Sequence, residues 1–263
     1  MLFRSVIASQ PGSTGVLSLN AGTVVNTGFV GVGVSQPGVI QPNGSVTQFN
    51  GGSGHLILND STIDTTTFEI GSGGLLSGDG GVITATGNVI VGGTISPGNS
   101  PGRITIDCNL ITLPGSRLIL DVLGTGTVFN VDHLILGNDA TFNLSNLQIV
   151  FNFLGNTDPN AFAASGGFNL DNFFESLNLT NGDITGLSTV FGPGQTWANV
   201  VNSSEVTVVS NAYDVTNLQL QSNGSFSVSA VPVPEPSTWA MLVLGLLALT
   251  AMALRRQCFA RPL

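Results

Sequence analysis

Apolar residues alternate with polar ones in short runs between residues 15 and 155, and this period constrains the fold more than any other feature. Spacing of two is the pattern of strands that bury one face. The runs end at turn-forming clusters such as GNSPG at 98–102. The alternating pairs and series are Leu17 and Leu19; Leu56 and Leu58; Ile104, Ile106, Cys108 and Leu110; Leu118, Leu120 and Val122; Leu134 and Leu136; Ile149, Phe151 and Phe153. The sequence therefore predicts a mainly β protein.

A repeat in the turn signals suggests how the strands are arranged. GSGHLIL near residue 53, GSGGLLSG near 72 and GGTISPGN near 92 recur about every twenty residues, the length of one coil of a β-solenoid. One coil cannot bury its apolar face alone, so neighbouring coils stack and share a core. We predict a solenoid body over residues 1–155. A β-sandwich with irregular loops is the alternative architecture.

Residues 92–144 also carry a resemblance. GGTISPGNSPGRITIDCNLITLPGSRLILDV, followed by VDHLILGNDATFNL, resembles the passenger-type β-helix repeats of autotransporters. The resemblance implies a right-handed parallel β-helix. It implies no activity, because a fold does not determine a function.

Residues 156–230 are expected to cap the solenoid with a small α/β region. Asp158 before Pro159, and Asn169 before Leu170, are typical helix starts. Four aromatic residues are expected to be buried in this cap, with a sugar-binding groove as the alternative; they are Phe162, Phe168, Phe173 and Phe174. Asn-Gly at 223–224 predicts a tight hairpin between two closing strands.

The C-terminal segment predicts a single membrane-spanning helix over residues 239–254. This stretch has no formal charge and would span roughly 24 Å as a helix, somewhat less than the roughly 30 Å hydrocarbon layer. Trp239 stands at one edge, Arg255 and Arg256 close the other, and a Pro-rich linker at 231–238 separates the segment from the body. A buried core helix is the alternative.

Orientation follows from the arginines. The positive-inside rule places the basic tail at 255–263 in the cytoplasm and the body outside, so the chain is expected to be exported. The opening MLFRSVIASQPGSTG lacks the apolar stretch of a signal peptide, and we therefore expect the true N-terminus to lie upstream of Met1, with an unusual export route as the alternative.

The linker, the apolar helix and the arginine pair together resemble the PEP-CTERM sorting signal of Gram-negative bacteria. The resemblance implies recognition and cleavage by an exosortase, transient anchoring in the inner membrane, and delivery to a cell surface or biofilm matrix, with exopolysaccharide as a candidate partner. The residues of the motif are Val233, Pro234, Glu235, Pro236, Ser237 and Thr238. The two prolines keep the motif extended, and Glu235 offers a single charge for recognition.

Charge and composition argue against several other functions. Up to Val231, three arginines stand against fourteen acids, and the chain contains no lysine, so nucleic-acid binding is not expected. No cofactor is expected. Two distant cysteines (Cys108 and Cys258) and two isolated histidines (His55 and His133) do not make a metal site. Cys108 is expected to be a small buried residue.

The acids of the body are scattered along the sequence. Asp60 and Asp64, or Asp121 and Asp132, would have to meet to form a carboxylate pair, and we expect these side chains to be solvated at turns and strand edges. We therefore predict a non-enzymatic surface or matrix protein. The alternatives are a carbohydrate-active β-helix enzyme and a tail-anchored adhesin whose helix is never removed.

Overall fold

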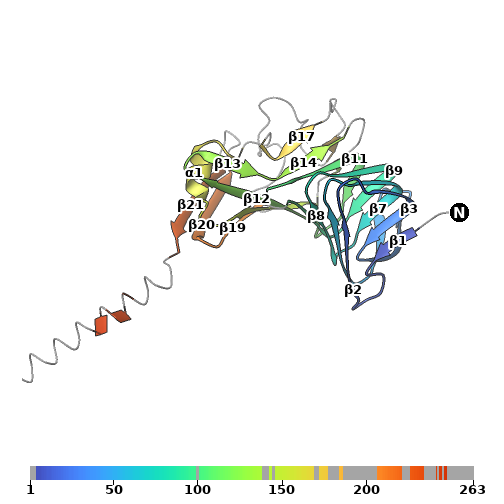
Figure 1. Cartoon of the computed structure of the whole chain (residues 1–263), viewed down its shortest axis with the longest axis horizontal. Helices are drawn as coiled ribbons and strands as arrows, with labels where there is room; N and C mark the ends of the chain where they lie inside the picture. Colours follow the sequence, from blue (N-terminus) through green and yellow to red (C-terminus); the bar gives the residue numbers. More distant parts are fainter. Residues whose placement is uncertain are drawn as a thin grey trace, which may run out of the picture.

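The chain is mainly β in the part that the computed structural model describes. That part comprises residues 4–98, 101–137, 142–143, 146–168, 172–176, 184–185, 206–220, 226–233, 241, 243–244 and 246–247. Two large sheets, both built mostly from parallel strands, form the body (Figure 1).

The first sheet contains, in spatial order, β1 (Arg4–Ile7), β3 (Val24–Val32), β7 (Thr62–Ile70), β9 (Gly81–Val91), β11 (Arg103–Thr112), β14 (His133–Leu136) and β17 (Phe174–Ser176). The short β15 (Phe142–Asn143) pairs with β11, and β18 (Ile184–Thr185) pairs with β15. The second contains β2 (Thr14–Leu19), β6 (Ser53–Leu58), β8 (Gly74–Gly78), β10 (Thr94–Pro97), β12 (Arg117–Thr125), β16 (Gln148–Phe153) and β19 (Val206–Ser210). The strand β13 (Val128–Val131) pairs antiparallel with β12.

The chain alternates between the two sheets. We call one circuit through both sheets a pass, and each pass stacks on the preceding one. Gly54 lies opposite Gly74 and Leu75 lies opposite Thr94, so these passes take 20 and 19 residues. The predicted twenty-residue repeat is therefore confirmed, because its three segments are the neighbouring strands β6, β8 and β10. The pairing is parallel, whereas the strands of a sandwich pair antiparallel. The likeness to passenger repeats stays a prediction.

Other passes are longer because extra elements are inserted. A hairpin of β4 (Val34–Ile40) and β5 (Val46–Asn50) follows β3, and α1 (Pro159–Ala164) follows β16. A second hairpin, β20 (Tyr213–Leu220) and β21 (Phe226–Pro232), follows β19. This hairpin confirms the predicted closing strands, although its turn at 221–225 is outside the described residues. The parallel sheets continue past residue 155 through β17 and β19.

The core lies between the sheets and contains the residues that alternate in the sequence. Leu56, Leu58, Ile104 and Ile106 are completely buried, and the expectation of a buried Cys108 is confirmed. Burial also raises the pKa of the Cys108 thiol to about 11. The expectation is wrong for Leu17, which is 38% exposed, because β2 is an edge strand of the second sheet and has only β6 beside it.

Glycine permits the close stacking of successive turns. Gly78 has a φ of 120°, a backbone conformation that is strained for residues with a side chain. A Cβ atom at this position would also collide with the backbone of Leu58 in the preceding pass. Gly78 also bridges to Gly98 of the following pass. The glycines of the repeat are thus needed where the backbones of adjacent turns meet.

An aromatic cluster fills the core where the parallel sheets approach α1. Phe162 of α1 packs edge-on against Phe168 with ring centroids 4.9 Å apart, and Phe151 lies 4.8 Å from Phe173. The predicted burial of Phe162, Phe168, Phe173 and Phe174 is confirmed, so these rings do not line a groove. The predicted helix start is also confirmed, because the Asp158 side chain caps α1 by accepting from the Asn160 backbone N–H at 2.8 Å.

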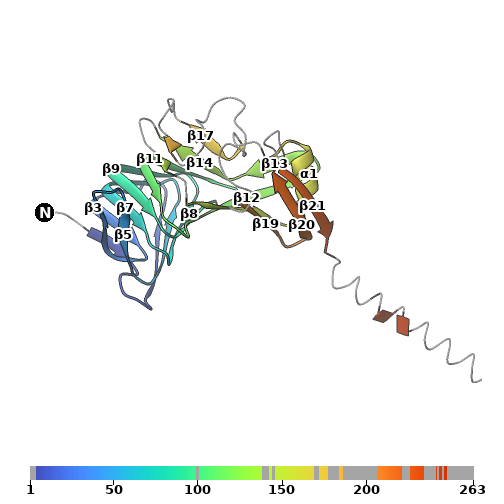
Figure 2. The same cartoon turned by 180° about the vertical axis from the view of Figure 1, so that it is seen from behind.

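The first strands and the hairpin β20–β21 stand at opposite ends of the body (Figures 1 and 2). Of residues 239–254, the structure describes Met241, Val243, Leu244, Leu246 and Leu247, which are helical and 52–71% exposed. Among the residues described, no helix combines the length and the apolar character needed to cross a bilayer. Most of the predicted membrane helix, the second helix start at Asn169, and the basic tail at 255–263 are outside the described residues.

Candidate functional site

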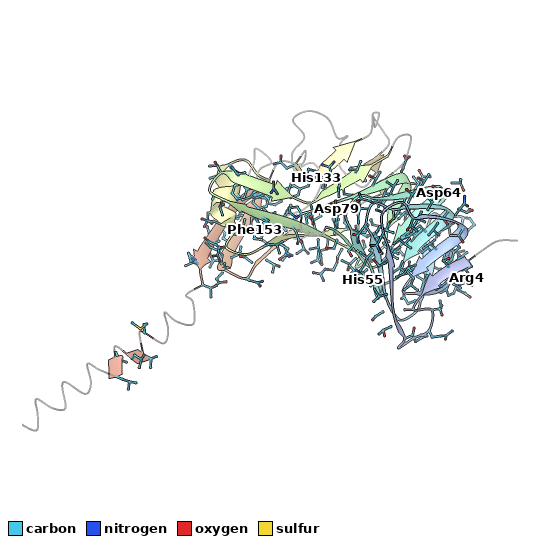
Figure 3. The ribbon with its side chains drawn as sticks, in the orientation of Figure 1. Arg4, His55, Asp64, Asp79, His133 and Phe153 are labelled. Atoms are coloured by element: carbon cyan, nitrogen blue, oxygen red, sulfur yellow. The ribbon has the colours of Figure 1, made fainter. Side chains whose placement is uncertain are left out.

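A pocket of about 450 Å³ opens in the middle of the body. The turn between β8 and β9, the start of β11, the strand β13 and the start of β14 surround it. Its lining residues are Asp79, Pro101, Gly102, Arg103, Phe129, Asn130, Val131, His133 and Asn172. Figure 3 shows Asp79 and His133 near one another here, whereas His55 lies farther toward the N-terminal strands.

One wall of the pocket is held by backbone contacts. The Asp79 carboxylate accepts from the Arg103 backbone N–H at 3.0 Å, and the Gly80 N–H donates to the Arg103 carbonyl at 2.8 Å. Gly78 and Gly80 both have positive φ, which allows the tight turn that carries Asp79 to this position. The side chains of Asp79 and Arg103 are exposed to solvent at the mouth of the pocket.

Asp132 lies behind the lining residues and is completely buried. One of its carboxyl oxygens accepts from the Gly102 N–H and the other from the Asp121 N–H, each at 2.8 Å. Burial raises the pKa of Asp132 to about 7; the two N–H donors oppose this rise, while the charges of Asp121 and Asp79 add to it. The side chain therefore connects the turn at 101–102 with β12.

The expectation that Asp121 and Asp132 are solvated is wrong. They meet because β13 folds back onto β12, with Val122 opposite Val131. Asp121 is only 7% exposed, and its carboxylate accepts from the Asn152 side-chain amide at 2.7 Å. All these contacts are internal hydrogen bonds, so the pair holds the backbone in place. Asp60, by contrast, is exposed as expected, and Asp64 is partly exposed.

Two other polar groups are partly or fully buried away from the pocket. Glu69 lies under the β4–β5 hairpin, where its carboxylate accepts from the Gly38 N–H at 2.6 Å. Burial raises the pKa of Glu69, although Gly38, Gln48 and Arg4 oppose the shift. His55 lies 2.8 Å from the Ser77 hydroxyl, and desolvation lowers its pKa. Within the described ranges, no three His, Cys, Asp or Glu side chains come together as metal ligands.

The base of the predicted sorting segment is well defined. The Val233 N–H donates to the Ala212 carbonyl at 2.8 Å, and this hydrogen bond joins the two ends of the β20–β21 hairpin opposite its turn. Asn160 of α1 bonds Ala230 of β21 twice, donating to its carbonyl at 2.8 Å and accepting from its N–H at 3.0 Å. The folded body therefore extends to Val233. The other predicted motif and anchor residues, Pro234, Glu235, Pro236, Ser237, Thr238, Trp239, Arg255 and Arg256, are outside the described residues.

Comparison with protein families identifies this segment. The PEP-CTERM protein-sorting motif matches residues 232–257, which include every residue predicted for sorting and orientation. The chain thus carries a C-terminal sorting signal of the PEP-CTERM type, as predicted, and the signal supports export by a membrane-anchored sorting route. The match covers 26 of 263 residues and leaves the body unassigned. No curated protein and no solved structure matched the chain.

The pocket is the part of the site that sequence reasoning missed. His133 and Asp132 are adjacent in the sequence, but Asp79 and Arg103 come from other passes of the chain. The only sequence signal for the pocket was the GDG triplet at 78–80, where glycines flank an acid in a tight turn.

Proposed function

We propose that the chain is an exported structural protein of the cell surface or extracellular matrix, and that an exosortase recognises and cleaves its C-terminal signal. The observation that carries this proposal is the match to the sorting motif at residues 232–257, which begins where the folded body ends. The body is proposed to be a non-enzymatic, right-handed β-solenoid that remains after cleavage.

The junction supports cleavage without unfolding of the body. Residues 234–238 follow the closed hairpin directly, and five extended residues span about 15 Å at 3.1 Å each. A processing enzyme in the membrane therefore reaches the motif while the β20–β21 hairpin remains paired. The Pro-Glu-Pro sequence contributes only one backbone N–H within these three residues, which disfavours its pairing with the body.

The exposed apolar residues support the membrane step. Met241 is 71% exposed and Leu246 is 63% exposed, which is unfavourable in water and favourable in lipid. With Arg255 and Arg256 on the cytoplasmic side, the body lies outside the inner membrane before it is released. A surface rich in hydroxyl and amide groups suits a hydrated matrix as its destination.

Mass spectrometry of the mature protein from its native host tests the proposal. We expect residues beyond Thr238 to be absent from the wild type. Substituting Glu235→Ala should leave the C-terminal segment attached, because it removes the single charge of the motif. The matched control Asp214→Ala removes an exposed carboxylate of β20 and should be processed normally.

Two outcomes would contradict the proposal. A mature wild-type chain that still ends at Leu263 would indicate an unprocessed, tail-anchored adhesin. An intact chain found in the cytosol would exclude export altogether.

A further inference from the structure

We propose that the pocket between β11, β13 and β14 binds an uncharged saccharide unit. This inference depends on the proposed function only for the source of the sugar, a polysaccharide outside the cell. The binding itself follows from the lining of the pocket.

The lining is rich in planar polar groups. Asp79, Arg103, Asn130 and His133 present carboxylate, guanidinium, amide and imidazole groups around one opening. Together they offer both donors and acceptors, and a sugar hydroxyl can act as either. The volume of about 450 Å³ lies within the roughly 300–1,000 Å³ typical of small-ligand sites.

Apolar residues also line the pocket. Phe129 and Pro101 both contribute to the wall, and the Phe129 ring is held edge-on against Phe162 at a centroid distance of 5.0 Å. Phe129 itself is only partly buried. An aromatic ring beside several hydrogen-bonding groups suits a pyranose, which has C–H groups on its face and hydroxyls at its edge.

Charge favours an uncharged ligand. The Asp79 carboxylate opposes an anion, and the body carries fourteen acids against three arginines up to Val231. A fully apolar ligand would take the exposed Asp79 and Arg103 side chains out of water without replacing their hydrogen bonds to water, which costs free energy. A neutral, hydroxyl-rich ligand avoids both penalties.

The pocket is formed before any ligand arrives. Asp132 fixes the Gly102 N–H and the Asp121 N–H, and Asp79 fixes the Arg103 N–H. The donors come from two separate segments, residues 102–103 and Asp121 of β12, so the walls do not depend on the ligand for their positions. Preformed walls reduce the ordering cost of binding.

Titration of the full-length protein with neutral and uronic-acid oligosaccharides tests the inference, with calorimetry and saturation-transfer NMR as readouts. The protein should be held in a zwitterionic detergent, because sugar-headed detergents would compete. We expect saturable binding of a neutral oligosaccharide. Arg103→Ala and Asn130→Ala should each weaken it about tenfold, the effect of losing one good hydrogen bond.

Arg117→Ala is the matched control. Arg117 is also an exposed arginine at the first position of a strand, and it lies outside the pocket, so this variant has the same net charge as Arg103→Ala. It should bind like the wild type. Thermal unfolding of each variant shows whether the fold is intact, and Asn130→Ala tests an exposed side chain that the core does not need.

Three results would overturn the inference. These are no binding across the neutral panel, binding confined to acidic sugars, and equal weakening by Arg103→Ala and Arg117→Ala. None of them affects the mass of the mature C-terminus, so a failure here is distinguishable from a failure of the sorting proposal.

Discussion

At Asp132, two opposing effects act on one carboxyl group. The two backbone N–H donors favour the ionised form, whereas removal from water favours the neutral form. Burial prevails, because the pKa is raised from 3.8 to about 7. Asp121, Asp79, Arg103 and His133 are the charged or titratable groups around this part of the body. The native state therefore holds a proton that the unfolded chain has already released at moderately acidic pH.

The sign of the pH dependence follows from this shift. A carboxyl with a raised pKa in the folded state contributes stability that is complete below about pH 4 and is lost as the pH rises through about 7. We expect the free energy of unfolding of the wild type to fall over this range. In Asp132→Asn the fall should be smaller, because no proton is exchanged at that position.

The same variant should be less stable than the wild type at pH 5. Its amide has only one oxygen, so one of the two backbone N–H groups faces another donor, which costs about 1–3 kcal/mol. The difference in the free energy of unfolding between the two proteins should become smaller toward pH 8. Denaturant unfolding from pH 4 to 8 measures both effects. Glu69 also has a raised pKa, but it is present in both proteins and cancels in the comparison. An unchanged pH slope in Asp132→Asn would show that Asp132 is not protonated in the fold.

At the scale of elements, the inserted hairpins and the helix make contacts that the stacked strands do not make among themselves. The β4–β5 hairpin covers Glu69, and β13 folds over β12 to bury Asp132. Within the described residues, the β20–β21 hairpin pairs with neither parallel sheet; it is attached through α1 and through Phe226, whose ring centroid lies 5.6 Å from that of Phe168. Each insertion therefore creates a local environment that the repeating strands alone do not provide.

Asn160 tests how the last hairpin is attached. Asn160→Ala removes both hydrogen bonds to Ala230 and should destabilise the body by about 1–3 kcal/mol. It should also increase amide hydrogen exchange in β21, which directly precedes the sorting motif. Hydrogen exchange with mass spectrometry measures this change peptide by peptide.

Asn217→Ala is a suitable control, since Asn217 is exposed on β20 of the same hairpin. We expect little change in β21 for this variant. Equal exchange in the two variants would show that Asn160 does not attach the hairpin to α1.

For the whole molecule, the structure separates a folded body from a C-terminal signal. The body is closed at Val233 by its bond to Ala212, and the described residues of the segment beyond it are highly exposed. Deleting residues 239–263 should therefore change the free energy of unfolding of the body by no more than about 0.5 kcal/mol. It should also abolish association with membrane vesicles.

Denaturant unfolding and vesicle flotation, applied to the full-length and shortened chains, measure the two effects. A clear loss of stability on shortening would mean that the apolar segment packs into the body. That result would support the core-helix alternative and would remove the physical basis for membrane anchoring.

The sequence by itself determined the features that depend on residues close together in the chain. Alternation at spacing two predicted the strands, and the glycine-rich turn segments predicted the twenty-residue repeat. The VPEPST motif with its apolar segment and arginines predicted the sorting signal that the family comparison identified. These patterns are local, and the side-chain period and turn chemistry determine them directly.

Only the tertiary structure decided which distant residues meet. Asp132 is buried against Asp121 because β13 reverses direction, and Asp79 reaches Arg103 because successive passes stack. The sequence contains the same aspartates whether they are solvated or buried. Leu17 follows the buried period, yet it is exposed because β2 has a neighbour on only one side. Whether a residue is buried depends on which other elements cover it, and this is a property of the assembled fold. The raised pKa of Asp132 and the pocket depend on the fold for the same reason.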